Sequence, residues 1–159
     1  MDKNKFVKFI AAILICQLVG IIGSIFTVSA ISGWYATIQK PLFNPPNWLF
    51  APVWTTLFLL MGISLYLVWE KGLEKKEVKL AVSVFGVQLA LNILWSFLFF
   101  GLQNPFLAFI EIVLLWIAIL ATTILFYGIS KKAGLLLIPY LLWVSFAAFL
   151  NYSIWILNL

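Results

Sequence analysis

The stretch FIAAILICQLVGIIGSIFTVSAI, residues 9–31, contains no charged side chain. A helix rises about 1.5 Å per residue, so about 20 apolar residues cross the hydrocarbon core of a bilayer, which is roughly 30 Å thick. A signal peptide has a shorter apolar stretch that ends at a small-residue cleavage site. No such site clearly follows here, and we therefore expect residues 9–31 to form a retained transmembrane helix.

Four more apolar stretches follow, at residues 48–69, 80–102, 106–129 and 133–157, and only Glu111 places a charge inside any of the five. Hydrophobic residues make up 65% of the 159 residues and charged residues 9%, whereas a soluble domain has about 25% charged residues. We therefore predict an all-α integral membrane protein. Residues 1–159 should form a single domain, a bundle of five transmembrane helices.

The basic residues predict the orientation of these helices. All ten are lysines, and nine of them fall on one side of a five-span arrangement, with only Lys40 on the other. Lysine-rich loops face the cytoplasm, so we expect a cytoplasmic N-terminus and an outside C-terminus in a prokaryotic plasma membrane. This placement also accounts for the net charge of +5 without a nucleic-acid partner. The nine lysines are Lys3, Lys5, Lys8, Lys71, Lys75, Lys76, Lys79, Lys131 and Lys132.

The composition excludes several kinds of chemistry. The chain has no histidine and a single cysteine, Cys16, which lies inside an apolar stretch. Histidine is the commonest metal ligand, a common haem ligand and the usual general base. We therefore predict no metal site, no bound cofactor and no conventional acid–base enzyme.

The loop between the first two predicted helices, residues 32–47, is the longest and is rich in proline. Proline fixes the backbone and removes a hydrogen-bond donor, so we expect an ordered segment rather than a mobile one. Long ordered loops often carry function. We call this segment the lid, and its candidate residues are Trp34, Pro41, Pro45 and Pro46.

Aromatic and amide residues recur at helical spacing on three of the predicted helices. Residues three or four apart share a helix face, and unpaired amides are costly in hydrocarbon. We expect these faces to converge on an aromatic pocket beneath the lid, which suits a flat, largely apolar ligand. In the alternative, the amides only tie one helix to another. The residues are Trp54 and Phe58; Gln88, Asn92 and Trp95; and Tyr140, Trp143, Ala147 and Asn151.

Glu111 is the only acid inside a predicted span. An ionisable group within a membrane is a candidate for function. Because it lies about five residues from the end of its helix, it can also reach the interface, stay protonated or pair with a neighbouring amide. The sequence leaves its role open.

Several motifs occur in a fixed order along most of the chain. Trp34-Tyr35 is followed by Lys40-Pro41, by Pro45-Pro46 and by FAPVW at residues 50–54. QLALN at residues 88–92 precedes Trp95, and PYLLW at residues 139–143 precedes LNY at residues 150–152. This series resembles the translocator protein family, also called tryptophan-rich sensory proteins (TspO/MBR).

The resemblance implies a five-helix bundle, commonly a homodimer, that binds porphyrins, haem or isoquinoline carboxamides beneath the loop after the first helix. Phe58 stands where tyrosine is common in the family. The sterol motif of animal relatives requires a basic residue shortly after Tyr152, which is absent here, so sterol binding does not carry over. By motif position, the pocket residues are Tyr35, Trp54, Phe58, Asn92, Trp143 and Ala147. The helical faces described above add Gln88, Trp95 and Asn151.

Three functions are compatible with these features. The leading one is a tetrapyrrole-binding membrane protein that acts in sensing, trafficking or stress response. The second is a light- and oxygen-dependent porphyrin-degrading enzyme, which the resemblance suggests because tryptophans matching Trp54 and Trp143 are implicated in some bacterial relatives. The third is a transporter of small hydrophobic molecules. We rank it last, because the chain shows no inverted repeat and has one buried acid for coupling.

Overall fold

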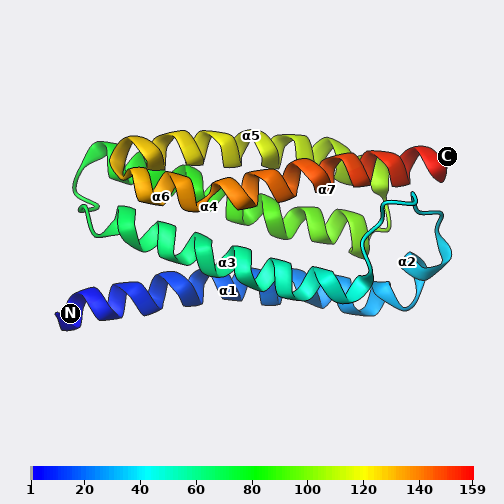
Figure 1. Ribbon diagram of the computed structural model, residues 1–159, viewed down its shortest axis with the longest axis horizontal. Helices are drawn as coiled ribbons and strands as arrows, with labels where there is room; N and C mark the ends of the chain where they lie inside the picture. Colours follow the sequence, from blue (N-terminus) through cyan, green and yellow to red (C-terminus); the bar gives the residue numbers. More distant parts are fainter. Residues whose placement is uncertain (1) are drawn as a thin grey trace.

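The computed structural model describes residues 2–159, and within them five helices are long and apolar enough to cross a membrane. They lie side by side along one axis (Figure 1). The five spans are α1, Lys3–Ile31; α3, Asn47–Trp69; α4 with η1, Lys76–Gly101; α5, Pro105–Ile129; and α6 with α7, Lys131–Leu157. The predicted five-span, all-helical fold is confirmed, although α1 begins six residues before the predicted residue 9 and α4 begins four before residue 80.

The contacts between helices define the neighbours in the bundle. α1 packs against α3 and α4, α4 packs against α5, and α5 packs against α7. The turn between η1 and α5 contains Gln103, whose φ of 53° is left-handed. Asn104 then caps α5, because its Oδ1 accepts a hydrogen bond of 3.0 Å from the backbone N–H of Leu107. This cap fixes α4 and α5 as an antiparallel hairpin.

The sequence predicted five continuous helical spans. Two of the observed spans depart from this prediction. α4, Lys76–Ser96, continues into a π-helical turn, η1, Phe97–Gly101, in which the N–H of Leu102 donates to the carbonyl of Phe97. The fifth span is divided at Leu137 into α6, Lys131–Leu136, and α7, Ile138–Leu157. Pro139 explains the division, because proline lacks an N–H and is best tolerated in the first turn of a helix.

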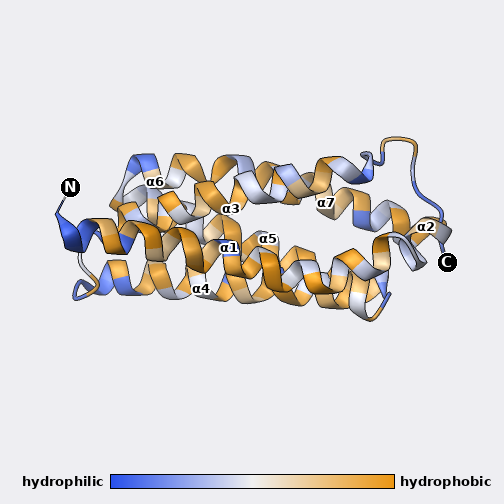
Figure 2. Cartoon of the chain, turned by 90° about the horizontal axis from the view of Figure 1, so that it is seen from below, coloured by the Kyte–Doolittle hydropathy of each residue, from blue (hydrophilic) through white to orange (hydrophobic). Residues whose placement is uncertain are grey.

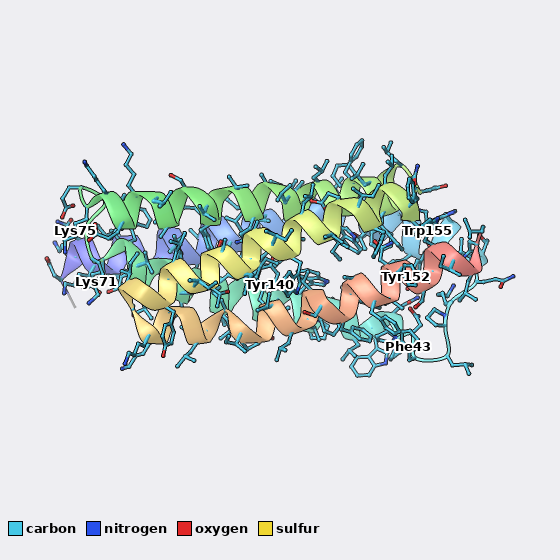
Figure 3. All side chains as sticks on the ribbon, turned by 90° about the horizontal axis from the view of Figure 1, so that it is seen from above. Phe43, Lys71, Lys75, Tyr140, Tyr152 and Trp155 are labelled. Carbon is cyan, nitrogen blue, oxygen red and sulfur yellow. The ribbon has the colours of Figure 1, made fainter. Side chains whose placement is uncertain are left out.

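The two ends of the bundle differ in character. Lys71 and Lys75 lie at the end opposite Trp155 (Figure 3). The hydrophilic segments there include the N-terminus and the start of α6 (Figure 2). We call this the lysine end, and the opposite end, which carries the short helix α2, Trp34–Thr37, the lid end. At the lysine end Lys5 forms a 2.6 Å ion pair with Glu70, and the hydrogen bond from Lys5 lowers the pKa of Glu70.

The lysine half of the bundle is closely packed. Phe85 of α4 stacks on Phe126 of α5, with ring centroids 5.3 Å apart. Gly62 of α3 faces the backbone of α1: a Cβ added there would lie 2.7 Å from the Cα of Ile13. Because interiors are packed at crystal-like density, the absence of a side chain at Gly62 lets α1 and α3 approach.

We predict that Gly62→Ala destabilises the bundle by about 1–3 kcal/mol, because the added methyl group forces two helix backbones apart. Gly86→Ala is the matched control, since a Cβ at Gly86 meets nothing within 4 Å and alanine favours a helix by about 1 kcal/mol over glycine. Thermal unfolding in one detergent measures both variants. Equal stability of the two would contradict this packing.

Candidate ligand-binding cavity

A cavity of about 340 Å³ occupies the lid half of the bundle. Its walls come from α1, α3, α4 with η1, and α7, and Tyr35 of α2 contributes from the lid. Eight of the nine residues predicted to bind ligand line this cavity, so the predicted helix faces meet there. They are Tyr35, Trp54, Phe58, Asn92, Trp95, Trp143, Ala147 and Asn151.

Eight of the 25 residues that line the cavity are aromatic. Trp54 and Phe58 stack on α3 with ring centroids 5.6 Å apart. Across from them, Trp143 of α7 meets Phe50 of α3 edge to face, with centroids 6.1 Å apart. These arrangements present flat aromatic surfaces on two helices, which suits a flat apolar molecule.

The ninth predicted residue, Gln88, lies behind the cavity and not on its wall. The hydroxyl of Tyr140 donates to Gln88 Oε1 at 2.9 Å and accepts from Asn92 Nδ2 at 2.9 Å. Figure 3 shows Tyr140 midway along the bundle. Gln88 thus orients Tyr140, Tyr140 orients Asn92, and Asn92 reaches the cavity.

Asn151 has a structural task in addition to its place on the wall. Its Oδ1 accepts from Trp95 Nε1 at 3.0 Å, and its Nδ2 donates to the carbonyl of Pro105 at 2.8 Å. One side chain on α7 therefore joins α4 and the start of α5. The Asn151 amide therefore ties helices together, which is the alternative role that the sequence left open for these amides.

Several buried polar atoms have no hydrogen-bond partner within residues 2–159. They are Nε1 of Trp143, Nε2 of Gln88 and both carboxyl oxygens of Glu111. Trp143 lines the cavity, and its N–H is buried without a partner among the described residues. Glu111 is 96% buried, from a relative exposure of 4%, and does not line the cavity. Its carboxyl group is buried within the bundle and pairs with no amide among residues 2–159.

Several hydrogen bonds hold the lid in place. Tyr35 is buried, its hydroxyl donates to Asn44 Oδ1 at 2.8 Å, and burial raises the pKa of its phenol. The ammonium of Lys40 donates to the carbonyls of Tyr35 and Ile38 and lies 4.8 Å from the centroid of the Tyr35 ring. The Asn158 carboxamide pairs with both backbone groups of Gln39 at 2.9 Å. These contacts tie the lid to the end of α7.

The four lid residues singled out in the sequence do not line the main cavity. Trp34 instead packs edge to face on Phe99 and borders a second cavity of about 290 Å³ at the lid end. Pro41 accepts a turn hydrogen bond from the N–H of Asn44, and Pro46 accepts one from Leu49. Pro45 accepts from Nδ2 of Asn44. These prolines shape the lid and the start of α3.

Sequence reasoning missed the contribution of α1 and η1 to the cavity. The first predicted helix is mostly apolar, with a few small or polar residues that did not lead us to predict a pocket there. The signal was the stripe Gln17, Gly20 and Ser24, at spacings of three and four. The π-helical turn brings Phe99 and Phe100 to the wall, and no local pattern in the sequence marks such a turn.

A model of the TspO/MBR family, described by that name, matches residues 12–156 of the chain. The chain belongs to the TspO/MBR family. The resemblance seen in the sequence motifs is therefore confirmed over nearly the whole chain.

Relatives from distant organisms agree with this assignment. A tryptophan-rich protein TspO of Chlorobaculum tepidum is 51% identical over 91% of both chains. One of Archaeoglobus fulgidus is 49% identical over 95% of this chain and 97% of its own. The translocator protein of Homo sapiens is 40% identical over 84% of this chain and 80% of its own. Together with the five spans, these likenesses make the chain a multi-pass membrane protein of this family.

We predict that Glu111→Leu and Asn151→Leu change stability in opposite directions. Glu111 has no partner to lose, so leucine removes a buried unpaired polar group and stabilises the protein by about 1–3 kcal/mol. Asn151→Leu leaves the Trp95 N–H and the Pro105 carbonyl unpaired and costs about 1–3 kcal/mol. Unfolding midpoints in one detergent measure both. A destabilised Glu111→Leu variant would reveal a partner of the carboxyl group that the structure lacks.

Proposed function

We propose that this TspO/MBR family member binds a porphyrin- or haem-type tetrapyrrole in the cavity and acts in tetrapyrrole sensing, trafficking or stress response. The observation that carries the proposal is a mostly apolar cavity that has aromatic rings of α3 and α7 on its wall. A tetrapyrrole is flat and mostly apolar, so it can lie between such rings. Isoquinoline carboxamides share these properties and are expected to compete for the cavity.

The polar groups on the wall support a ligand held mainly by stacking. Trp143 offers an unpaired N–H, and Asn92 is held in place by Tyr140. Among the described residues on the wall there is no histidine, cysteine, methionine or lysine. A wall without these strong metal ligands favours recognition of the macrocycle face over coordination of a central metal. Metal-free porphyrin is therefore the probe of choice.

The size of the cavity limits how much of a ligand it can enclose. Pockets for drug-sized molecules range from about 300 to 1,000 Å³, and a cavity of about 340 Å³ is near the lower bound. A large macrocycle is therefore expected to enter with one edge, while its opposite edge stays outside the wall. Ala147 contributes to this space, because its methyl group leaves room beside Trp143.

We predict that protoporphyrin IX quenches tryptophan fluorescence saturably and that Trp143→Phe weakens binding roughly two- to tenfold, as expected for about 0.5–1.5 kcal/mol of aromatic contact. Trp116→Phe is the matched control, because the N–H of Trp116 donates to Ser145 Oγ at 2.8 Å and its ring is not on the cavity wall. Titration in nanodiscs measures both variants. Quenching that never saturates, or that is equal in the two variants, would mean that porphyrin partitions into lipid only.

A second candidate, light-driven porphyrin degradation, is favoured by the placement of Trp54 and Trp143 on two neighbouring helices that line the same cavity. An indole in contact with an excited macrocycle can donate one electron to it, and molecular oxygen can add to the resulting radical anion. The adduct then returns the electron to the oxidised indole as the ring opens, so both oxygen atoms enter the product and the indole is restored. The protein would supply the electron donor and the position, while light and oxygen supply the driving force. No acid–base group is required.

We predict that, if this second function operates, illuminated samples in air lose the porphyrin absorption band and dark samples keep it. The double variant Trp54→Phe with Trp143→Phe is expected to slow the loss at least tenfold when the bound porphyrin is matched. Absorption spectra over time, with and without oxygen, are the measurement. If the porphyrin band disappears at the wild-type rate in the double variant, neither indole takes part in the degradation.

The surroundings of the protein remain predictions from the sequence. The nine lysines gathered toward one end favour a cytoplasmic N-terminus in a prokaryotic plasma membrane. A homodimer is expected from the family resemblance, and sterol binding is not expected because no basic residue follows Tyr152. Labelling of single cysteines from either side of sealed vesicles tests the orientation.

A further inference from the structure

One wall of the cavity is open to the outside of the bundle. The cavity-lining residues on one face of α1 and one face of α3 are also exposed on the molecular surface, and Ile21 and Val28 have relative exposures of 58% and 70%. The ribbons of α1 and α3 separate toward the lid end (Figure 2). The exposed lining residues are Ile21, Ser24 and Val28 on α1, and Asn47, Ala51 and Thr55 on α3.

The other walls are closed by side-chain contacts. Between α3 and α7, Phe50 meets Trp143 and Trp54 meets Tyr140, with ring centroids 6.1 and 6.3 Å apart. Between α1 and η1, the rings of Phe26 and Phe97 meet with centroids 5.3 Å apart. The lid closes the end of the bundle through the contacts of Tyr35, Lys40 and Asn158. The side between α1 and α3 is therefore the open side.

The opening between α1 and α3 has a defined lower limit. Gln17 Nε2 donates to the backbone carbonyl of Thr55 at 3.1 Å. One turn further along α1, a Cβ at Gly20 would lie 2.7 Å from the ring of Phe58, so the two helices touch there. From Ile21 to Val28 the opening extends about 10 Å along α1, at about 1.5 Å per residue. It thus lies within the part of the bundle that faces hydrocarbon.

We propose that the ligand enters and leaves the cavity sideways from the bilayer, through the window between α1 and α3 bordered by Ser24 and Ala51. This proposal rests on the proposed function, because it gives the route of the same ligand. The molecule that passes through the window is a planar amphiphile already dissolved in the leaflet at the lid end. The apolar body passes between small side chains, and its polar substituents stay near Asn47, toward the membrane surface.

The lid is the competing route, and its contacts disfavour it. Passage through the lid requires the Asn158 pair with Gln39, the Tyr35 bond to Asn44 and the Lys40 contacts to break together. Passage through the window requires only that exposed side chains on two helix faces move apart. The window also explains why the small cavity suffices, because one edge of a large macrocycle can remain in the bilayer.

A reversible cross-link across the window tests the route. In a Cys16→Ala background, Ser24→Cys with Ala51→Cys is joined by a short thiol-reactive linker that a reductant cleaves. We expect the cross-link to slow association and dissociation of protoporphyrin IX at least tenfold in nanodiscs. Both rates are expected to recover on reduction of the same sample, which serves as its own folding control.

The matched control places the same linker on the lid. Gln39→Cys with Asn158→Cys joins the two segments that already pair in the structure, and we expect its cross-link to leave both rates within about twofold. Slowing by the lid cross-link and not by the window cross-link would overturn the proposal. Equal rates before and after window cross-linking would also overturn it.

A third arm needs no variant and uses the wild-type chain. With entry from the bilayer, the association rate follows the mole fraction of porphyrin in the lipid when its aqueous concentration is held constant. A rate that follows only the aqueous concentration contradicts the window. If wild-type quenching is not saturable at all, the proposed function itself fails, whereas saturable binding with unaffected rates refutes the window alone.

Discussion

The carboxamide of Asn151 is the interaction on which the lid half of the bundle depends. From α7 it accepts the indole N–H of Trp95 on α4 and donates to the carbonyl of Pro105 at the start of α5. Water is absent from the hydrocarbon core, so polar groups there find partners within the protein. Fixing α4, α5 and α7 together in this way leaves α1 and α3 as the two helices that can stand apart. The cavity and its open side lie where they do because of this division.

The two halves of the bundle use different means of stability, and the difference suits a binding protein. The lysine half relies on close backbone approach at Gly62 and on stacked rings such as Phe85 and Phe126. The lid half relies on aromatic walls, a few directed hydrogen bonds and a lid that is hydrogen-bonded to the end of α7. A rigid half that anchors a hollow half keeps the aromatic surfaces in place without filling the space between them.

The polar side chains divide between structural and ligand-facing roles. Gln88 and Asn151 pair with other protein groups, whereas Asn92 and Trp143 belong to the wall of the cavity. Glu111 fits neither class: it is buried, unpaired and away from the cavity wall. Sequence patterns do not separate these roles, because an amide at a helical position looks the same whether its partner is a helix or a ligand.

The sequence by itself determined the five spans, the clustering of lysines, the family and eight of the nine predicted wall residues. Most of these follow from local properties: an apolar run long enough to cross a bilayer, charge at helix ends, and side chains repeated every three or four residues. The family and the place of Tyr35 on the wall came instead from the resemblance of the motifs to known proteins. Only the tertiary structure decided that Gln88 stands behind Tyr140, that η1 turns Phe99 and Phe100 inward, and that Leu137 interrupts the last span. It alone revealed the contribution of α1 and the opening beside Ser24 and Ala51. These features depend on how far two helices stand apart, which is set by contacts between residues distant in the chain.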